Sequence, residues 1–66
     1  MTFAEKLLSV RKQLLLSQEA IAKELGVSFA TVNRWEKGKC DPGYKAQKAF
    51  NDFCEANNIV FETVGS

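Results

Sequence analysis

The sequence predicts an all-α domain of about four short helices, followed by a short extended C-terminal arm. Four segments repeat apolar residues at helical spacing, and their ends carry residues that cap helices. A short β-branched and aromatic run follows the last of these segments. The 66 residues allow one small hydrophobic core, near the lower limit for folding without disulfides or a metal.

The first helix is expected from Phe3 to about Leu15. Thr2 and Glu5 have the spacing of a capping box, in which each side chain accepts a hydrogen bond from the backbone N–H of the other residue. The leucine run at residues 14–16 is wider than one helix face, so part of it should pack against a neighbouring element. The inner face of this helix is predicted to hold Phe3, Leu7, Val10 and Leu14.

Two shorter helices should follow, joined by a tight turn at Gly26. Ser17 and Ser28 suit the two N-caps because a hydroxyl oxygen can accept from a first-turn N–H. Glycine adopts the left-handed conformation that such a turn requires. The predicted inner residues are Ile21, Ala22 and Leu25 in the first of these helices, and Val32 and Trp35 in the second. Trp35 is therefore expected in the core rather than stacked on a base.

The fourth helix is predicted to start at Asp41-Pro42, an acceptor followed by a residue with fixed φ. Its inner face would hold Ala46, Phe50, Phe53 and Cys54. Residues 59–64 are typical of a strand or an extended arm, which has no partner strand in this chain. We therefore divide the chain into a domain of residues 1–57 and an arm of residues 58–66, which can dimerise or dock a partner.

Charge is unevenly distributed, although the net charge is only +1. Residues 28–48 are basic and residues 49–66 are acidic. This division fits a nucleic-acid footprint, but on its own it fits a chance pattern on a solvated surface equally well. The basic residues of the middle segment are Arg34, Lys37, Lys39, Lys45 and Lys48.

The composition argues against an enzyme, a cofactor or a metal site. The chain has no histidine, no glycine-rich phosphate loop and no cysteine near a plausible base. Cys40 and Cys54 are expected as free thiols, with Cys54 acting as a small core residue. No apolar run approaches the roughly 18 residues of a membrane span, and no signal peptide precedes the first helix. We therefore expect a cytoplasmic, nucleoid-associated protein that does not bind a membrane.

Two short helices joined by a glycine turn form the helix-turn-helix geometry, which places its second helix in the major groove of DNA. With Val32 and Trp35 inward, the opposite side of that helix carries a polar stripe of Ala30, Asn33, Arg34 and Lys37. Ser28 and Phe29 project from its N-terminal tip.

Residues 14–42 resemble the phage repressor and Cro family of helix-turn-helix domains, also called XRE-like. The matching residues are Arg11, Gln18, Glu19, Ala22, Leu25-Gly26-Val27-Ser28, Val32, Trp35-Glu36-Lys37-Gly38-Lys39 and Pro42. With the flanking helices, the resemblance covers about residues 3–57. It implies a lambda-repressor-like domain that binds double-stranded DNA, an operator, through a recognition helix at about residues 28–37.

The resemblance also implies roles for individual residues. It implies phosphate contacts for Ser17, Gln18 and Lys39, with Gln18 also bracing the recognition helix. Base or phosphate contacts are implied for Ser28, Phe29, Ala30, Thr31 and Arg34, and the polar stripe adds Asn33 and Lys37. Arg11 and Glu36 are implied to form a buried structural ion pair.

Several of these roles have alternatives. Arg34 can read guanine or contact a phosphate, and Asn33 can read adenine or remain solvated surface. Phe29 and Ala30 stand where many family members carry polar side chains. Phe29 can meet a thymine methyl or pack back against a helix.

Three functional hypotheses remain. The favoured one is a homodimeric transcriptional repressor whose residues 59–64 pair two copies. The second is an antitoxin-like subunit that docks a protein partner through residues 57–66. The third uses the same fold as a protein-interaction domain without DNA, and the basic middle segment counts against it.

Overall fold

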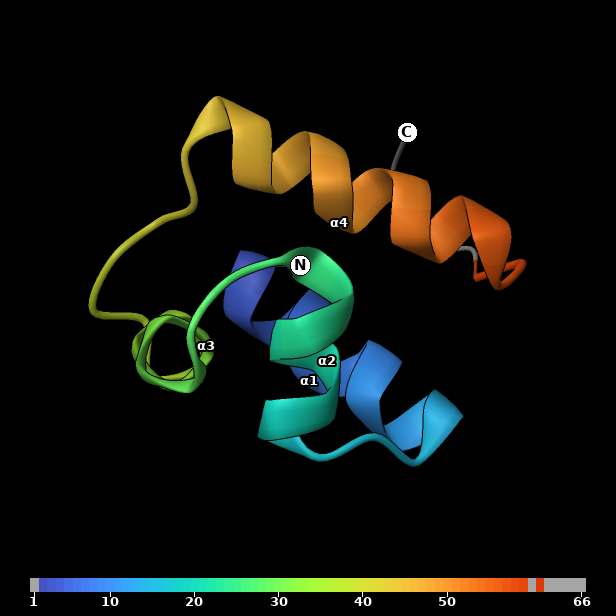
Figure 1. The fold of residues 1–66 in the computed structure, drawn as a ribbon, viewed down its shortest axis with the longest axis horizontal. Helices are drawn as coiled ribbons and strands as arrows, with labels where there is room; N and C mark the ends of the chain where they lie inside the picture. Colours follow the sequence, from blue (N-terminus) through green and yellow to red (C-terminus); the bar gives the residue numbers. More distant parts are fainter. Residues whose placement is uncertain (1, 60, 62–66) are drawn as a thin grey trace.

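The computed structural model describes residues 2–59 and 61 of the chain. It contains four helices in the order α1 (Phe3–Leu14), α2 (Gln18–Leu25), α3 (Phe29–Glu36) and α4 (Tyr44–Ala56). In Figure 1, α4 lies along one side of the molecule, and the other three helices lie together opposite it, with α3 seen almost end-on. No strand occurs within the described residues. The all-α prediction is therefore confirmed.

The ends of the first two helices are held by the predicted caps. The backbone N–H of Thr2 donates to Glu5 Oε1 at 2.9 Å, and the N–H of Glu5 donates to Thr2 Oγ1 at 3.2 Å. Ser17 Oγ accepts from the N–H of Ala20 at 3.0 Å and so caps α2. Gly26 ends α2 in the left-handed region, at φ 71°.

The start of α4 differs from the prediction. The helix begins at Tyr44 rather than at Asp41-Pro42, and its N-cap is Gly43, which offers no side-chain hydrogen bond. Pro42 is buried while Asp41 is exposed, and the Pro42 carbonyl accepts from Gln47 Nε2 at 3.2 Å. Packing of the proline ring, rather than capping by Asp41, therefore determines where the helix begins.

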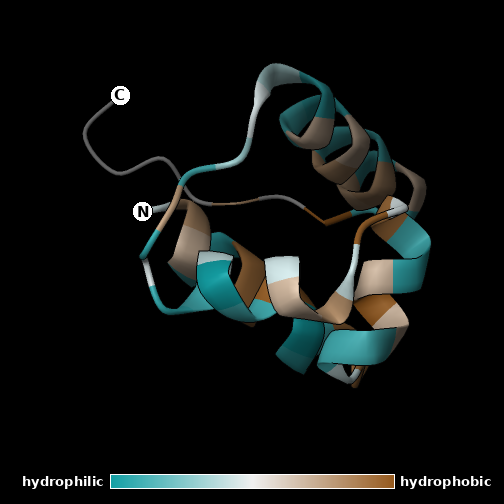
Figure 2. Cartoon of the chain, turned by 60° about the vertical axis from the view of Figure 1, so that its left-hand side comes forward, coloured by the Kyte–Doolittle hydropathy of each residue, from teal (hydrophilic) through white to brown (hydrophobic). Residues whose placement is uncertain are grey.

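The core is built from the predicted inner faces. Figure 2 shows hydrophobic residues on the faces that the helices turn toward one another. The ring of Phe3 meets the indole of Trp35 edge to face, with centroids 5.4 Å apart, and meets the ring of Phe50 at 4.9 Å. Trp35 is a core residue, as expected. The buried residues of the core are Leu7, Val10, Ile21, Ala22, Leu25, Val32, Trp35, Phe50 and Cys54.

The leucine run after α1 divides between the core and the surface. Leu14 and Leu16 pack against the core, as predicted for part of the run. Leu15 is 91% exposed and caps α1 in the left-handed conformation, at φ 55°. The α1–α2 turn therefore carries an exposed leucine in a backbone region that favours glycine.

The segment after α4 returns to the core of its own chain. Asn58 adopts φ 56°, and the N–H of Ile59 donates to the Cys54 carbonyl at 2.9 Å. Ile59 and Phe61 are partly buried against the core, and neither lies in a strand. The other positions of the predicted 59–64 strand, residue 60 and residues 62–64, lie outside the described residues.

Both cysteines are free, with Cys40 exposed and Cys54 buried. Within the described part of the chain, no helix is long and apolar enough to cross a membrane.

Candidate nucleic-acid interface

The outward face of α3 is positioned by its packing against α1 and α2. Gly26 makes the turn between α2 and α3, and the N–H of Val27 donates to the Ala22 carbonyl at 3.0 Å, which closes the end of α2. Val32 and Trp35 fix the inner side of α3 in the core. The polar stripe on the opposite side is consequently held outward by two helices that pack into the core.

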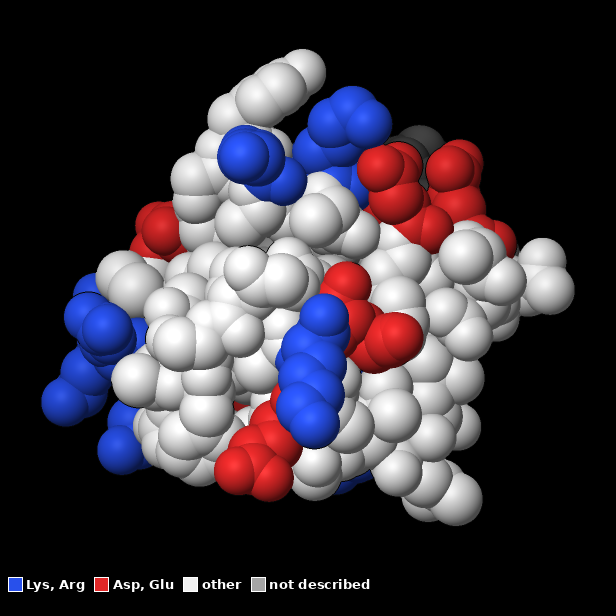
Figure 3. All heavy atoms as spheres, in the orientation of Figure 1, with Lys and Arg blue, Asp and Glu red and all other residues white. Residues whose placement is uncertain are grey.

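Basic side chains project from α3 and from the segment that follows it. Arg34, Lys37 and Lys39 are all exposed. Figure 3 shows Lys and Arg projecting at the left, over α3 and the segment after it, and also at the top over the first half of α4. Asp and Glu gather at the upper right over the end of α4, and side chains of both signs lie together at the centre. On α4, the charge of Lys48 is partly neutralised because its Nζ lies 3.2 Å from Asp52 Oδ2. Exposed positive charge therefore lies on α3 and on the segment directly after it.

A shallow hollow of about 280 Å³ lies on the outer side of α3, and we call it the α3 hollow. It combines an apolar end, where Phe29 is 48% exposed, with an amide, a guanidinium and two ammonium groups. Phe29 lies outside the core cluster, so its ring is available to a ligand. The residues that line the α3 hollow are Phe29, Ala30, Asn33, Arg34, Lys37 and Lys39.

Ser28 and Thr31 are engaged with each other at the start of α3. Ser28 Oγ accepts from the N–H of Thr31 at 3.2 Å, and the two hydroxyl oxygens lie 2.9 Å apart. Ser28 therefore serves first as the N-cap of α3. Because one hydroxyl donates to the other, only one hydroxyl hydrogen of the pair remains for DNA.

Ser17 and Gln18 lie at the N-terminus of α2. Ser17 is exposed and accepts from the backbone through its oxygen, so its hydroxyl hydrogen is free to donate. Gln18 is partly buried, and its Nε2 donates to Glu36 Oε1 at 2.8 Å. This bond joins the start of α2 to the end of α3.

Arg11 and Glu36 form a two-contact ion pair. Arg11 Nη1 lies 2.7 Å from Glu36 Oε1 and 2.8 Å from Oε2, and Arg11 Nε donates to the Leu16 carbonyl at 3.1 Å. The side chains are 22% and 12% exposed, so most of the surface of the pair is withdrawn from solvent.

Sequence reasoning missed the contact between Gln18 and Glu36. The two residues are 18 positions apart and belong to different helices. Helical spacing relates residues only within one helix, so it gives no signal for this bond. The resemblance pointed to bracing by Gln18 without naming the acceptor.

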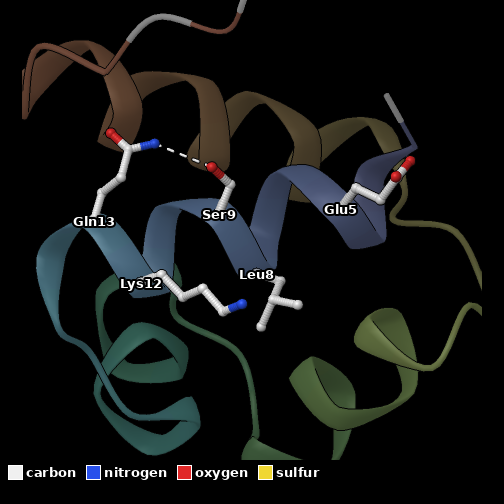
Figure 4. Close-up of a pocket in the computed structure, with 5 residues that line it drawn as sticks. All are labelled: Glu5, Leu8, Ser9, Lys12 and Gln13. Carbon is white, nitrogen blue, oxygen red and sulfur yellow. Dashed lines mark hydrogen bonds between the residues drawn. The ribbon is translucent and has the colours of Figure 1, made fainter.

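A second hollow, of about 340 Å³, lies on α1. Figure 4 shows its side chains projecting from one side of α1, with Gln13 Nε2 donating to Ser9 Oγ at 3.0 Å. It contains none of the residues expected to bind DNA. In the portion of the chain that the structure covers, no group of three or more His, Cys, Asp and Glu residues could hold a metal ion. The residues lining the α1 hollow are Glu5, Leu8, Ser9, Lys12 and Gln13.

Comparison with known proteins agrees with this geometry. A family model described as "Helix-turn-helix" matches residues 7–45, which include α2, the turn and α3. The chain is also 38% identical over 53 residues to the HTH-type transcriptional activator BcrR of Enterococcus faecalis. That match spans 80% of this chain but only 26% of the relative. No solved structure matches the chain. The chain belongs to the XRE-like helix-turn-helix family of DNA-binding transcriptional regulators.

Proposed function

We propose that this chain binds double-stranded DNA in a sequence-specific manner, with α3 in the major groove. The observation that supports this most directly is the α3 hollow, where the exposed Arg34 lies beside Phe29 and Ala30. The major groove of B-DNA admits one α-helix and presents both hydrogen-bonding groups and thymine methyl groups. A surface that combines a guanidinium with an exposed aromatic ring is suited to both.

Phosphate contacts would orient α3 in the groove. We assign them to Ser17 and Gln18 at the N-terminus of α2, where backbone N–H groups and the helix dipole also favour an anion. Lys39 follows α3, and we assign it a contact to the flanking backbone. With about three to five phosphates bound per copy, affinity should fall steeply as salt rises.

Base contacts would come from the α3 hollow. Arg34 is proposed to donate to guanine O6 and N7, which is the commonest specific contact of arginine in the major groove. The Phe29 ring can make only an apolar contact, and the apolar group that the major groove presents is the thymine methyl. Asn33 lies within the same hollow and is assigned a supporting contact to adenine.

The active species is proposed to be a homodimer that represses transcription. One copy of this helix-turn-helix reaches a single half-site, and family members pair half-sites about one helical turn apart. We assign pairing of two copies to residues 59–64, of which Ile59 and Phe61 are only partly buried against the core of their own chain. Repression would follow where the bound operator overlaps a promoter. A reporter gene whose expression rises with this protein would instead establish an activator, which is the activity named for the E. faecalis relative.

The test is selection of binding sites from a random duplex DNA library with the purified protein. An inverted repeat with half-site centres one turn apart is expected. Enrichment of a single half-site would retain sequence-specific binding but overturn the homodimer. No enrichment at low salt would overturn the proposed function, and co-purification of an unrelated protein would then favour the antitoxin-like alternative.

A further inference from the structure

Glu36 is the meeting point of three helices. Its Oε1 accepts from Arg11 Nη1 of α1 at 2.7 Å and from Gln18 Nε2 of α2 at 2.8 Å, while Glu36 itself ends α3. The third member, Gln18, is a residue to which a phosphate contact is assigned.

The carboxylate fixes the orientation of the Gln18 amide. A carboxylate only accepts hydrogen bonds, so the amide must turn its nitrogen toward Glu36, because the reverse orientation would oppose two acceptor oxygens. Nε2 carries two hydrogens, and the bond to Glu36 uses one of them. The second hydrogen remains free to donate to an acceptor such as a phosphate oxygen.

Arg11 supports this arrangement in two ways. Its Nε donates to the carbonyl of Leu16, two residues before Gln18, and therefore restrains the chain where it enters α2. Its guanidinium also neutralises the carboxylate. An unpaired carboxylate beside the N-terminus of α2 would repel an approaching phosphate.

We propose that Glu36, held by Arg11, is a positioning residue that presents the Gln18 amide to a backbone phosphate of DNA. The inference rests on the proposed function for its last step. It assigns Glu36 an effect on DNA affinity that passes through Gln18, in addition to its part in stability.

The orientation is tested first without DNA, by NMR of the Gln18 side-chain amide in the free protein. In the natural chain its two Nε2 protons should be displaced from the positions of a solvated glutamine, because one is bound to a carboxylate. Glu36→Gln should move them toward the solvated positions. Asp52→Asn is the matched control, because it removes the carboxylate of an exposed ion pair, Lys48–Asp52, and should leave the Gln18 amide unchanged.

Binding is then compared on a duplex of arbitrary sequence at low salt. Gln18→Ala and Glu36→Gln should each weaken binding by about three- to tenfold, a loss typical of one hydrogen bond. In the double variant, Glu36→Gln should add no further loss to Gln18→Ala, since the contact it positions is already absent. Circular dichroism of each variant must show the native helix content.

Two results would overturn the inference alone. The first is a double variant whose loss of affinity equals the product of the two single losses. The second is an NMR signal of a solvated Gln18 amide in the natural protein. The NMR measurement on the natural protein remains informative if Glu36→Gln does not fold. A natural protein that binds no duplex at low salt would overturn the proposed function as well. The two failures are therefore distinguishable.

Discussion

The ring of Phe61 stacks on the ring of Phe50, with centroids 6.2 Å apart and planes inclined by 18°. Lys6 Nζ lies 5.6 Å from the centroid of the Phe61 ring. Phe50 is a buried core residue of α4, and Lys6 belongs to α1. Phe61 therefore contacts both the first and the last helix. A residue beyond the last helix thus packs against the core.

Phe61→Ala is expected to lower the free energy of unfolding by about 1–2 kcal/mol, because a partly buried ring and its aromatic contact are lost. Urea unfolding followed by the fluorescence of Trp35 measures the change. Tyr44→Ala is the control, since Tyr44 is 86% exposed and its loss should change stability by less than about 0.5 kcal/mol. Equal stability of Phe61→Ala and the natural chain would show that the stacking contributes nothing.

Leu15→Gly is expected to raise the free energy of unfolding by about 0.5–1 kcal/mol. Leu15 has φ 55° and is 91% exposed, so glycine relieves backbone strain and sacrifices little packing. Gly26→Ala is the opposite test, because Gly26 has φ 71° with no atom within 4 Å of an added Cβ. It should cost about 1 kcal/mol from backbone strain alone. Thermal unfolding of the two variants should shift the midpoint in opposite directions.

Periodicity and caps predicted the described fold because both depend on residues close in sequence. The inner faces of α1 to α4, the capping box at Thr2 and the turn at Gly26 are of this kind. The prediction of where α4 starts was wrong because burial of Pro42, a tertiary effect, outweighed the local cap signal of Asp41. Likewise, the bond from Gln18 to Glu36 depends on how α2 and α3 cross, which no local pattern encodes.

The two cysteines should react at very different rates. Cys40 is exposed, whereas burial raises the pKa of the Cys54 thiol above its ordinary value of 9.0. Reaction with a chromogenic disulfide at pH 8 should therefore modify one thiol rapidly and the second only on unfolding. Cys40→Ser should remove the fast phase and leave the slow one. Rapid modification of Cys54 in that variant would contradict its burial.

The Cys54 thiol also predicts a loss of stability in alkali. The folded state holds the proton more tightly than the unfolded state, so unfolding releases a proton at pH values between 9.0 and the raised pKa. Stability from this group is complete below pH 9 and decreases as pH rises beyond it.

The capping box predicts a small loss of stability in acid. The hydrogen bonds from Thr2, first that of its backbone N–H, lower the pKa of Glu5 below its ordinary value of 4.5. The contribution of Glu5 is therefore present above pH 4.5 and is lost as pH falls through the lowered pKa. Glu5→Gln does not titrate, so its stability should change less between pH 6 and pH 3 than that of the natural chain. Parallel urea titrations at the two pH values measure the difference, and equal acid sensitivity would exclude a role for Glu5.

Arg34→Ala is expected to separate base recognition from phosphate binding. The Arg34 side chain makes no ion pair within the described residues and lines the α3 hollow, so its guanidinium can reach a base without breaking an internal contact. Its loss should cost about 1–3 kcal/mol on the selected site and remove the preference at one base pair.

Lys39→Ala supplies the contrast for Arg34→Ala, because a phosphate contact carries no sequence information. It should weaken binding by a similar factor on every site variant. The slope of log affinity against log salt should fall by about one, the amount expected for the loss of one phosphate contact. Affinities for all single-base variants of the selected half-site, measured at one fixed salt concentration, compare the two patterns. If Arg34→Ala weakens binding uniformly, as Lys39→Ala should, then Arg34 contacts a phosphate and base recognition falls to Phe29 and Asn33.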